Sequence, residues 1–136
     1  MNNKVLAVLD YCILPIISQM SQMKLLNGYL SDKNSKISFY TLETTISLVS
    51  QSVLKNKINE NPKIKGFIFY SLIQFSYGNK TNTDLIEDIL KKNYEIFFFR
   101  EDIYLKTLND LKKNKKKIKL FSFNNKELIF KFKSFL

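Results

Sequence analysis

Side chains that could bind a ligand gather where the apolar runs of this sequence end. The clearest run is GFIFYSLIQF, residues 66–75, which opens as a buried strand should and closes on Tyr70, Ser71 and Gln74. Hydroxyl and amide groups both donate and accept hydrogen bonds, so this end of the run suits a hydroxyl-rich ligand. The other interpretation is that these groups only cap a strand that ends in water.

Two carboxylates, Glu43 and Glu101, follow two other apolar runs. If those runs are neighbouring strands, the carboxylates would share a site, and their repulsion would raise one pKa and produce an acid–base pair. Glu43 could instead precede a helix and interact with its dipole. Arg100, the only arginine in the chain, could hold a carboxylate or phosphate through two hydrogen bonds, or pair with acidic groups at the surface.

The composition excludes several kinds of catalytic and metal site. Histidine is absent and Cys12 is the only cysteine, so an intrachain disulfide, the usual Cys/His zinc sites and the Ser–His and Cys–His catalytic pairs are ruled out. The three glycines, at positions 28, 66 and 78, cannot build a glycine-rich phosphate loop. We therefore expect no metal and no cofactor, and acid or base chemistry would fall to carboxylates, lysines, tyrosines or the thiol.

Apolar runs rich in strand formers alternate with helical patterns over the first hundred residues. The expected elements, in chain order, are a strand at 4–11, a helix that starts near Pro15 and ends before Ser31, a strand at 36–42, a helix from 44 or 45 to 61, a strand at 65–72, a helix at 81–93 with Leu85, Ile86, Ile89 and Leu90 towards the core, and a strand at 94–99. This order predicts an α/β fold with a mostly parallel sheet and helices on both faces. Ligands bind at the carboxyl ends of such strands, where the polar groups described above would meet.

The pattern changes towards the C-terminus. Residues 105–111 could form a short helix, and the chain beyond them a hairpin that turns at Asn124 and Asn125, because asparagine tolerates left-handed turns. A terminal helix is the rival interpretation. We expect one domain, with an α/β unit over residues 1–105 and a basic extension over residues 106–136 that could pack on it.

The basic excess of the chain, whose formal net charge is +10, is concentrated in KKNKKKIK, residues 112–119. Such a stretch can bind the phosphate backbone of a nucleic acid or another anionic surface. The candidates for such contacts are Lys112, Lys113, Lys115, Lys116 and Lys117. The stretch lacks interleaved arginines and aromatic residues, which disfavours nucleic-acid binding, and its other interpretation is a linker in water.

Several of these pieces occur together in one known family. They are, in chain order, Gln19, Gln22, Tyr29, Glu43, the run GFIFYSLIQF and the run EIFFFRED. The series resembles the sporadic carbohydrate cluster family, small bacterial proteins whose genes lie among surface-polysaccharide genes. The resemblance spans residues 13–105 and is most specific at Tyr70, Ser71, Leu72 and Gln74. It implies a role in surface-polysaccharide biosynthesis, with a sugar or nucleotide-sugar ligand bound by Gln19, Gln22, Tyr70, Ser71, Gln74 and Arg100, and with Glu43 and Glu101 as acid–base or sugar-binding carboxylates.

The chain departs from that family at several positions. Leu30 stands where the family has a cysteine, Phe97 stands where it has a histidine, and the first strand lacks an arginine. Any chemistry that relies on those residues would be absent here. The strand order also resembles the catalytic domain of serine recombinases, which implies a resolvase-like architecture. The arginines that would neutralise a phosphate in recombination are missing, so this likeness implies shared architecture and not shared activity.

The expected setting is the bacterial cytoplasm. The longest uncharged runs, residues 11–23 and 66–79, fall short of the roughly 20 residues that span a bilayer, and residues 1–10 show no signal-peptide cleavage site. The expected partner is a sugar-type small molecule or another protein of the polysaccharide pathway, with nucleic acid as the alternative. Whether the protein catalyses a reaction, and its oligomeric state, stay open.

Overall fold

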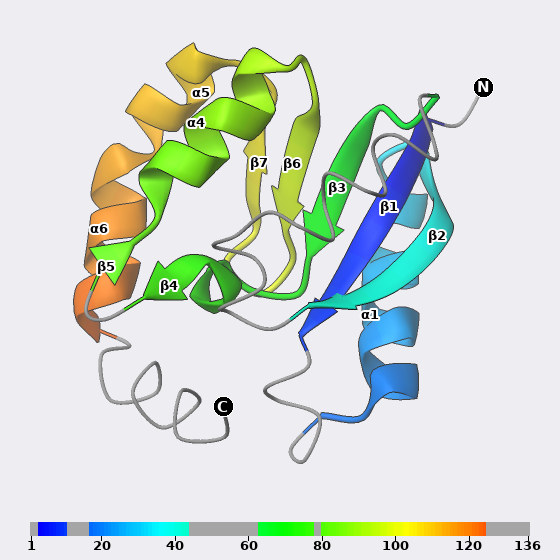
Figure 1. Cartoon of the computed structure of the whole chain (residues 1–136). Coiled ribbons are helices and arrows are strands. Elements are labelled where there is room, and N and C mark those ends of the chain that lie inside the picture. The colour runs from blue at the N-terminus through cyan, green and yellow to red at the C-terminus, as the bar shows by residue number, and fades with distance from the viewer. Residues whose placement is uncertain (1–2, 11–16, 44–62, 78–79, 125–136) are drawn as a thin grey trace.

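A computed structural model of the chain describes residues 3–10, 17–43, 63–77 and 80–124 (Figure 1). The elements along the chain are β1 (Asn3–Asp10), α1 (Gln19–Ser31), β2 (Ser35–Glu43), β3 (Gly66–Phe69), the 3-10 turn η2 (Leu72–Phe75), β4 (Ser76–Tyr77), β5 (Lys80–Thr81), α4 (Thr83–Lys91), β6 (Glu95–Phe98), β7 (Ile103–Leu105), α5 (Leu108–Lys113) and α6 (Lys115–Asn124). The helix predicted between residues 44 and 61 lies outside the described residues.

Five strands form one sheet in the order β2-β1-β3-β6-β7. The pairs from β2 to β6 are all parallel, at the four places where the sequence pattern predicts strands. β7 pairs antiparallel with β6, and its three residues are too few to show a period in the sequence. The predicted α/β fold with a mostly parallel sheet is therefore confirmed, with one added antiparallel edge strand.

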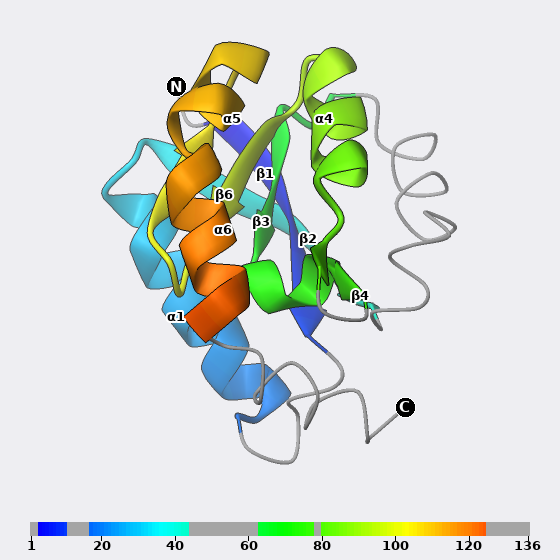
Figure 2. The same ribbon diagram turned by 90° about the vertical axis from the view of Figure 1, so that its left-hand side faces the viewer.

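Helices cover both faces of this sheet, as predicted, with α1 and α4 on opposite sides (Figure 2). Successive residues of a strand point to opposite faces. In β1, Val5 and Leu9 belong to the core cluster that contains residues of α1, whereas Leu6 and Val8 belong to the cluster that contains residues of α4. The four residues predicted to face the core from α4 are all buried: Leu85, Ile86, Ile89 and Leu90.

The described part of the C-terminal region is helical, so the predicted hairpin is wrong over these residues. α6 runs through Asn124, the position at which the hairpin would begin its turn. Ile118 is 3% exposed and joins the core cluster of α4, whereas Leu120 is 60% exposed. In a strand, residues two apart point to the same face, so Ile118 and Leu120 would be buried or exposed together. Their different exposure fits a helix and not a strand. The lysine-rich stretch consequently lies on α5 and α6 and is not a linker.

Two other elements begin or end differently from the prediction. β3 ends at Phe69, and the chain then turns through η2 instead of extending the strand. α1 begins at Gln19, after Ser18, whose hydroxyl accepts a hydrogen bond from the backbone N–H of Ser21 at 3.2 Å. Such a cap satisfies one of the free N–H groups at a helix start. The segment around Pro15, where we expected the start, lies outside the described residues.

Candidate functional site

The exit of β3 is a tight turn whose polar side chains are buried. Ser71 is fully buried and Gln74 is 2% exposed. The side-chain oxygen of Gln74 accepts a hydrogen bond from the backbone N–H of Ser71 at 3.1 Å, and its amide nitrogen donates to the Val8 carbonyl of β1 at 3.1 Å. The Ser71 hydroxyl accepts from the backbone N–H of Ile73 at 3.2 Å. The spacing Ser-x-x-Gln thus closes the turn and ties it to the centre of the sheet.

Glu101 joins this turn to the turn between β6 and β7. One carboxylate oxygen accepts a hydrogen bond from the backbone N–H of Leu72 at 2.8 Å, and the other accepts from the Ser71 hydroxyl at 2.8 Å. Burial raises the pKa of Glu101, while these two hydrogen bonds and the positive charge of Arg100 oppose the rise. The structure therefore brings two predicted site residues, Ser71 and Glu101, into direct contact at the carboxyl ends of the strands.

The Glu101 carboxylate has more acceptor positions than Ser71 and Leu72 occupy. An ionised carboxylate accepts hydrogen bonds at about four lone-pair positions; the contacts with Ser71 and Leu72 use two of them, and the backbone N–H of Glu101 itself donates to a further one. Glu101 is partly exposed and the preceding residue, Arg100, is exposed. An acceptor and a donor of opposite charge therefore lie next to each other in this turn. A partly buried carboxyl with a raised pKa is the kind of group that marks functional sites.

The other predicted ligand-binding residues differ in exposure and in the contacts that their side chains make. Gln19 is exposed at the first position of α1. Gln22 is fully buried, and its amide nitrogen donates to the Ile17 carbonyl at 3.2 Å. Tyr70 is 8% exposed, and its ring lies 5.7 Å from that of Phe99 between centroids. Burial leaves Gln22 and Tyr70 little surface with which to touch a ligand, and their contacts here hold the fold.

Glu43 ends β2, and its side chain lies outside the described residues. Its strand is the first of the sheet, and β6, which leads to Glu101, is the fourth. Neighbouring strands lie about 4.8 Å apart, so three steps separate β2 from β6 by roughly 14 Å. A pair of carboxylates that shares a proton requires neighbouring strands, and β2 and β6 are not neighbours.

The sequence pattern does not reveal that the β6–β7 turn has a partner on α1. Asp102 has a φ of 53°, a left-handed conformation that aspartate adopts more readily than most residues. Its carboxylate accepts a hydrogen bond from the Tyr29 hydroxyl at 2.7 Å. Burial and this hydrogen bond raise the pKa of Tyr29. The only sequence signal for Asp102 is its place just after an apolar run, and its partner lies 73 positions away.

The candidate lysines lie on two consecutive helices. Lys112 and Lys113 occupy the last turn of α5, where positive charge suits the helix dipole. Lys115, Lys116 and Lys117 open α6. All five are exposed, so each is accessible to an anionic surface.

Within the described residues, none of the helices combines the length and the apolar character that crossing a membrane requires. No three acidic, histidine or cysteine side chains in that part of the chain are placed to hold a metal ion. The sequence matches no model of a known protein family, and no curated protein matches it.

Proposed function

We propose that this protein acts in surface-polysaccharide biosynthesis in the cytoplasm and binds a sugar or nucleotide-sugar ligand at the carboxyl ends of the parallel strands. The observation that carries the proposal is the Glu101 carboxylate, which Ser71 and Leu72 hold beside an exposed arginine. The residues that hold it belong to the motif on which the carbohydrate-cluster resemblance is most specific. The mostly parallel sheet supports a resolvase-like architecture as well.

The chemistry of this edge suits a hydroxyl-rich ligand. Sugar hydroxyls donate hydrogen bonds to carboxylates and accept them from guanidinium groups, and Glu101 and Arg100 supply one of each. Because Ser71 and Leu72 hold the carboxylate before a ligand arrives, little side-chain freedom is lost on binding. The Arg100 guanidinium would also pair with the diphosphate of a nucleotide sugar through two parallel hydrogen bonds.

Proton transfer, if the bound ligand reacts, would fall to Glu101 and Glu43. Because its pKa is raised, the Glu101 carboxyl releases its proton at higher pH than an ordinary glutamate, as a general acid must. Glu43, at the far end of the same edge, would act on another part of the ligand.

Calorimetric titration of a panel of nucleotide sugars, each compared with its nucleotide alone, tests the proposal. We expect the sugar to strengthen binding, with little change between low and moderate salt. Glu101→Gln should weaken nucleotide-sugar binding by roughly tenfold, because a charge-assisted contact becomes a neutral one. Glu87→Gln is the matched control, since Glu87 is a partly exposed carboxylate on α4, and it should bind like the wild type. Equal binding by Glu101→Gln, or no binding of any nucleotide sugar, would contradict the proposal.

Nucleic-acid binding is the second candidate, and it is favoured by the five exposed lysines on α5 and α6. Phosphate-driven binding weakens steeply with salt because counterions are released. A labelled DNA duplex would then bind at low salt and dissociate as salt is added. Replacement of Lys115, Lys116 and Lys117 by glutamine would weaken this binding, and Glu101→Gln would leave it unchanged. Absence of any duplex binding at low salt would rule this candidate out.

A further inference from the structure

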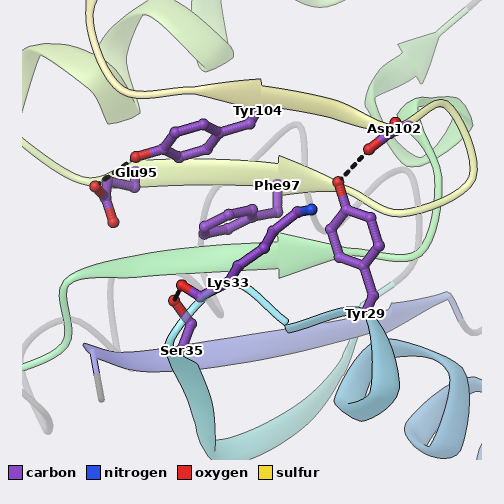
Figure 3. A pocket seen from close by; sticks show the side chains of 7 residues that line it. All are labelled: Tyr29, Lys33, Ser35, Glu95, Phe97, Asp102 and Tyr104. Atoms are coloured by element: carbon purple, nitrogen blue, oxygen red, sulfur yellow. Dashed lines mark hydrogen bonds between the residues drawn. The ribbon is translucent and has the colours of Figure 1, made fainter. Parts of the chain in front are cut away.

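A pocket lies on the α1 face of the sheet, and none of the residues that hold Glu101 lines it (Figure 3). Its volume is about 340 Å³, and its lining comes from α1, the turn after α1, β2, β6, the β6–β7 turn and β7. Tyr29 and the run EIFFFRED, residues 95–102, supply four of its lining residues, and only the folded chain brings them together with Lys33, Ser35 and Tyr104. It is therefore a separate place at which a ligand could be held.

Two stacked aromatic rings form one wall of the pocket. Phe97 and Tyr104 are paired across β6 and β7, and their rings stack at 4.7 Å between centroids with 17° between planes. Phe97 is 3% exposed, whereas Tyr104 is 42% exposed. The buried ring supports the exposed one and covers its face towards β6, so this wall is firm and its accessible part belongs to Tyr104.

Two carboxylates lie at opposite ends of the pocket, and each is held by a phenol (Figure 3). The Tyr29 hydroxyl donates to Asp102 at 2.7 Å, and the Tyr104 hydroxyl donates to Glu95 at 2.7 Å. Burial and these hydrogen bonds raise the pKa of both tyrosines, so the phenols keep their protons. They fix the direction of each carboxylate, which retains lone pairs for the donors of a ligand.

Lys33 supplies a hydrogen-bond donor to the same pocket. Its ammonium lies over the ring of Tyr29, 4.3 Å from the centroid, in the cation–π arrangement. The position over this ring that would suit a cationic ligand is thus taken by the chain itself. The Lys33 ammonium and the two carboxylates together offer both hydrogen-bond donors and acceptors. A simple cation would use only the acceptors and a simple anion only the donors, so the pocket suits a ligand that both donates and accepts.

We propose that this pocket binds one neutral, hydroxyl-rich ring of monosaccharide size. The C–H groups of such a ring would pack against the exposed part of the Tyr104 ring, whose face towards Phe97 is covered. Its hydroxyls donate to Asp102 and Glu95, and its oxygens accept from Lys33. The pocket volume is near the lower end of the roughly 300–1,000 Å³ found for small-molecule sites, which suits one ring and not a whole nucleotide sugar. The proposal goes beyond the strand-exit site, because its residues and its ligand size are different.

Saturation-transfer NMR on the full chain tests this proposal, with methyl β-glucoside, methyl β-galactoside, choline and inorganic phosphate as probes. We expect transfer to at least one glycoside, strongest at the C–H protons of one ring face, and none to choline or phosphate. Tyr104→Ala should weaken glycoside binding by roughly three- to tenfold through loss of the exposed ring. Leu120→Ala is the matched control, since it truncates a residue that is 60% exposed on α6, and it should bind like the wild type.

Asp102→Asn is a second variant that should keep the turn, because asparagine adopts left-handed conformations as readily as aspartate. It removes the charge, and we expect weaker glycoside binding. Glu101→Gln separates the two sites, since it should leave glycoside binding unchanged while nucleotide-sugar binding falls. The pocket proposal is overturned if no glycoside binds up to about 20 mM, if Tyr104→Ala binds as tightly as the wild type, if choline or phosphate binds instead, or if Glu101→Gln alone abolishes glycoside binding.

Discussion

The side-chain amide of Gln74 holds the turn after β3 through two hydrogen bonds, one from its oxygen and one from its nitrogen. Its oxygen accepts from Ser71 and its nitrogen donates to Val8, so the interior satisfies the polar atoms of a side chain that is 2% exposed. The hydroxyl and amide groups that end the run GFIFYSLIQF therefore hold a turn. Glu101 is the group that reaches the ligand edge, and Ser71 positions it.

Gln74→Ala should lower the free energy of unfolding by about 3 kcal/mol, because it leaves a buried N–H and a buried carbonyl without their partners. Urea denaturation followed by circular dichroism measures the change. Gln19→Ala is the matched control, because Gln19 is exposed at the start of α1, and it should change stability by less than about 0.5 kcal/mol. Similar losses in the two variants would show that the Gln74 hydrogen bonds add nothing to stability.

β3 and α1 each contain a glycine, and the two glycines have opposite surroundings. A Cβ atom at Gly66 would collide with the backbone carbonyl of Glu95 in the neighbouring strand β6. A Cβ atom at Gly28, in α1, would have no atom within 4 Å. Close approach of two strands therefore requires glycine at position 66, whereas nothing in the packing of α1 requires it at position 28.

Gly66→Ala should destabilise the protein by about 1–3 kcal/mol, because β3 and β6 must move apart to admit the methyl group. Gly28→Ala should stabilise it by about 0.5–1 kcal/mol, because alanine loses less backbone freedom in a helix. Chemical denaturation of both variants gives the two values with their signs. A gain in stability at position 66 would mean that the two strands are not packed as closely as described.

The sheet, α4 and α6 share one core. Ile118 of α6 lies in the same cluster as Leu6 of β1 and Phe98 of β6, so α6 packs on the α/β unit. Lys115, Lys116 and Lys117 are then exposed residues of a helix that packs on this core. A single cooperative unfolding transition is expected for such an arrangement.

Ile118→Ala should lower the free energy of unfolding by about 2–4 kcal/mol, through lost burial and a cavity in the core. Leu120→Ala, two residues along the same helix and 60% exposed, should cost no more than about 0.5 kcal/mol. Thermal unfolding of both variants should keep one transition. A separate early transition in Ile118→Ala would instead indicate that α6 unfolds independently of the sheet.

Much of the fold could be predicted because burial leaves a local signature in the chain. Apolar runs mark β1, β3 and β6 as strands covered on both faces, and the spacing of Leu85, Ile86, Ile89 and Leu90 marks the inner face of α4. The polar residues at the strand exits could also be picked out, since they follow these runs directly. In each case the signal lies within a few neighbouring residues.

Contacts between distant segments could not be predicted in this way. Glu101 meets Ser71 across 30 positions and Asp102 meets Tyr29 across 73, while β7 and α6 take their places through packing with β6 and the core. A local pattern states which side of an element is buried, but not which element covers it. Pairing of remote segments depends on the free energy of the whole packed chain, and the strand-exit contact and the aromatic pocket both arise at that level.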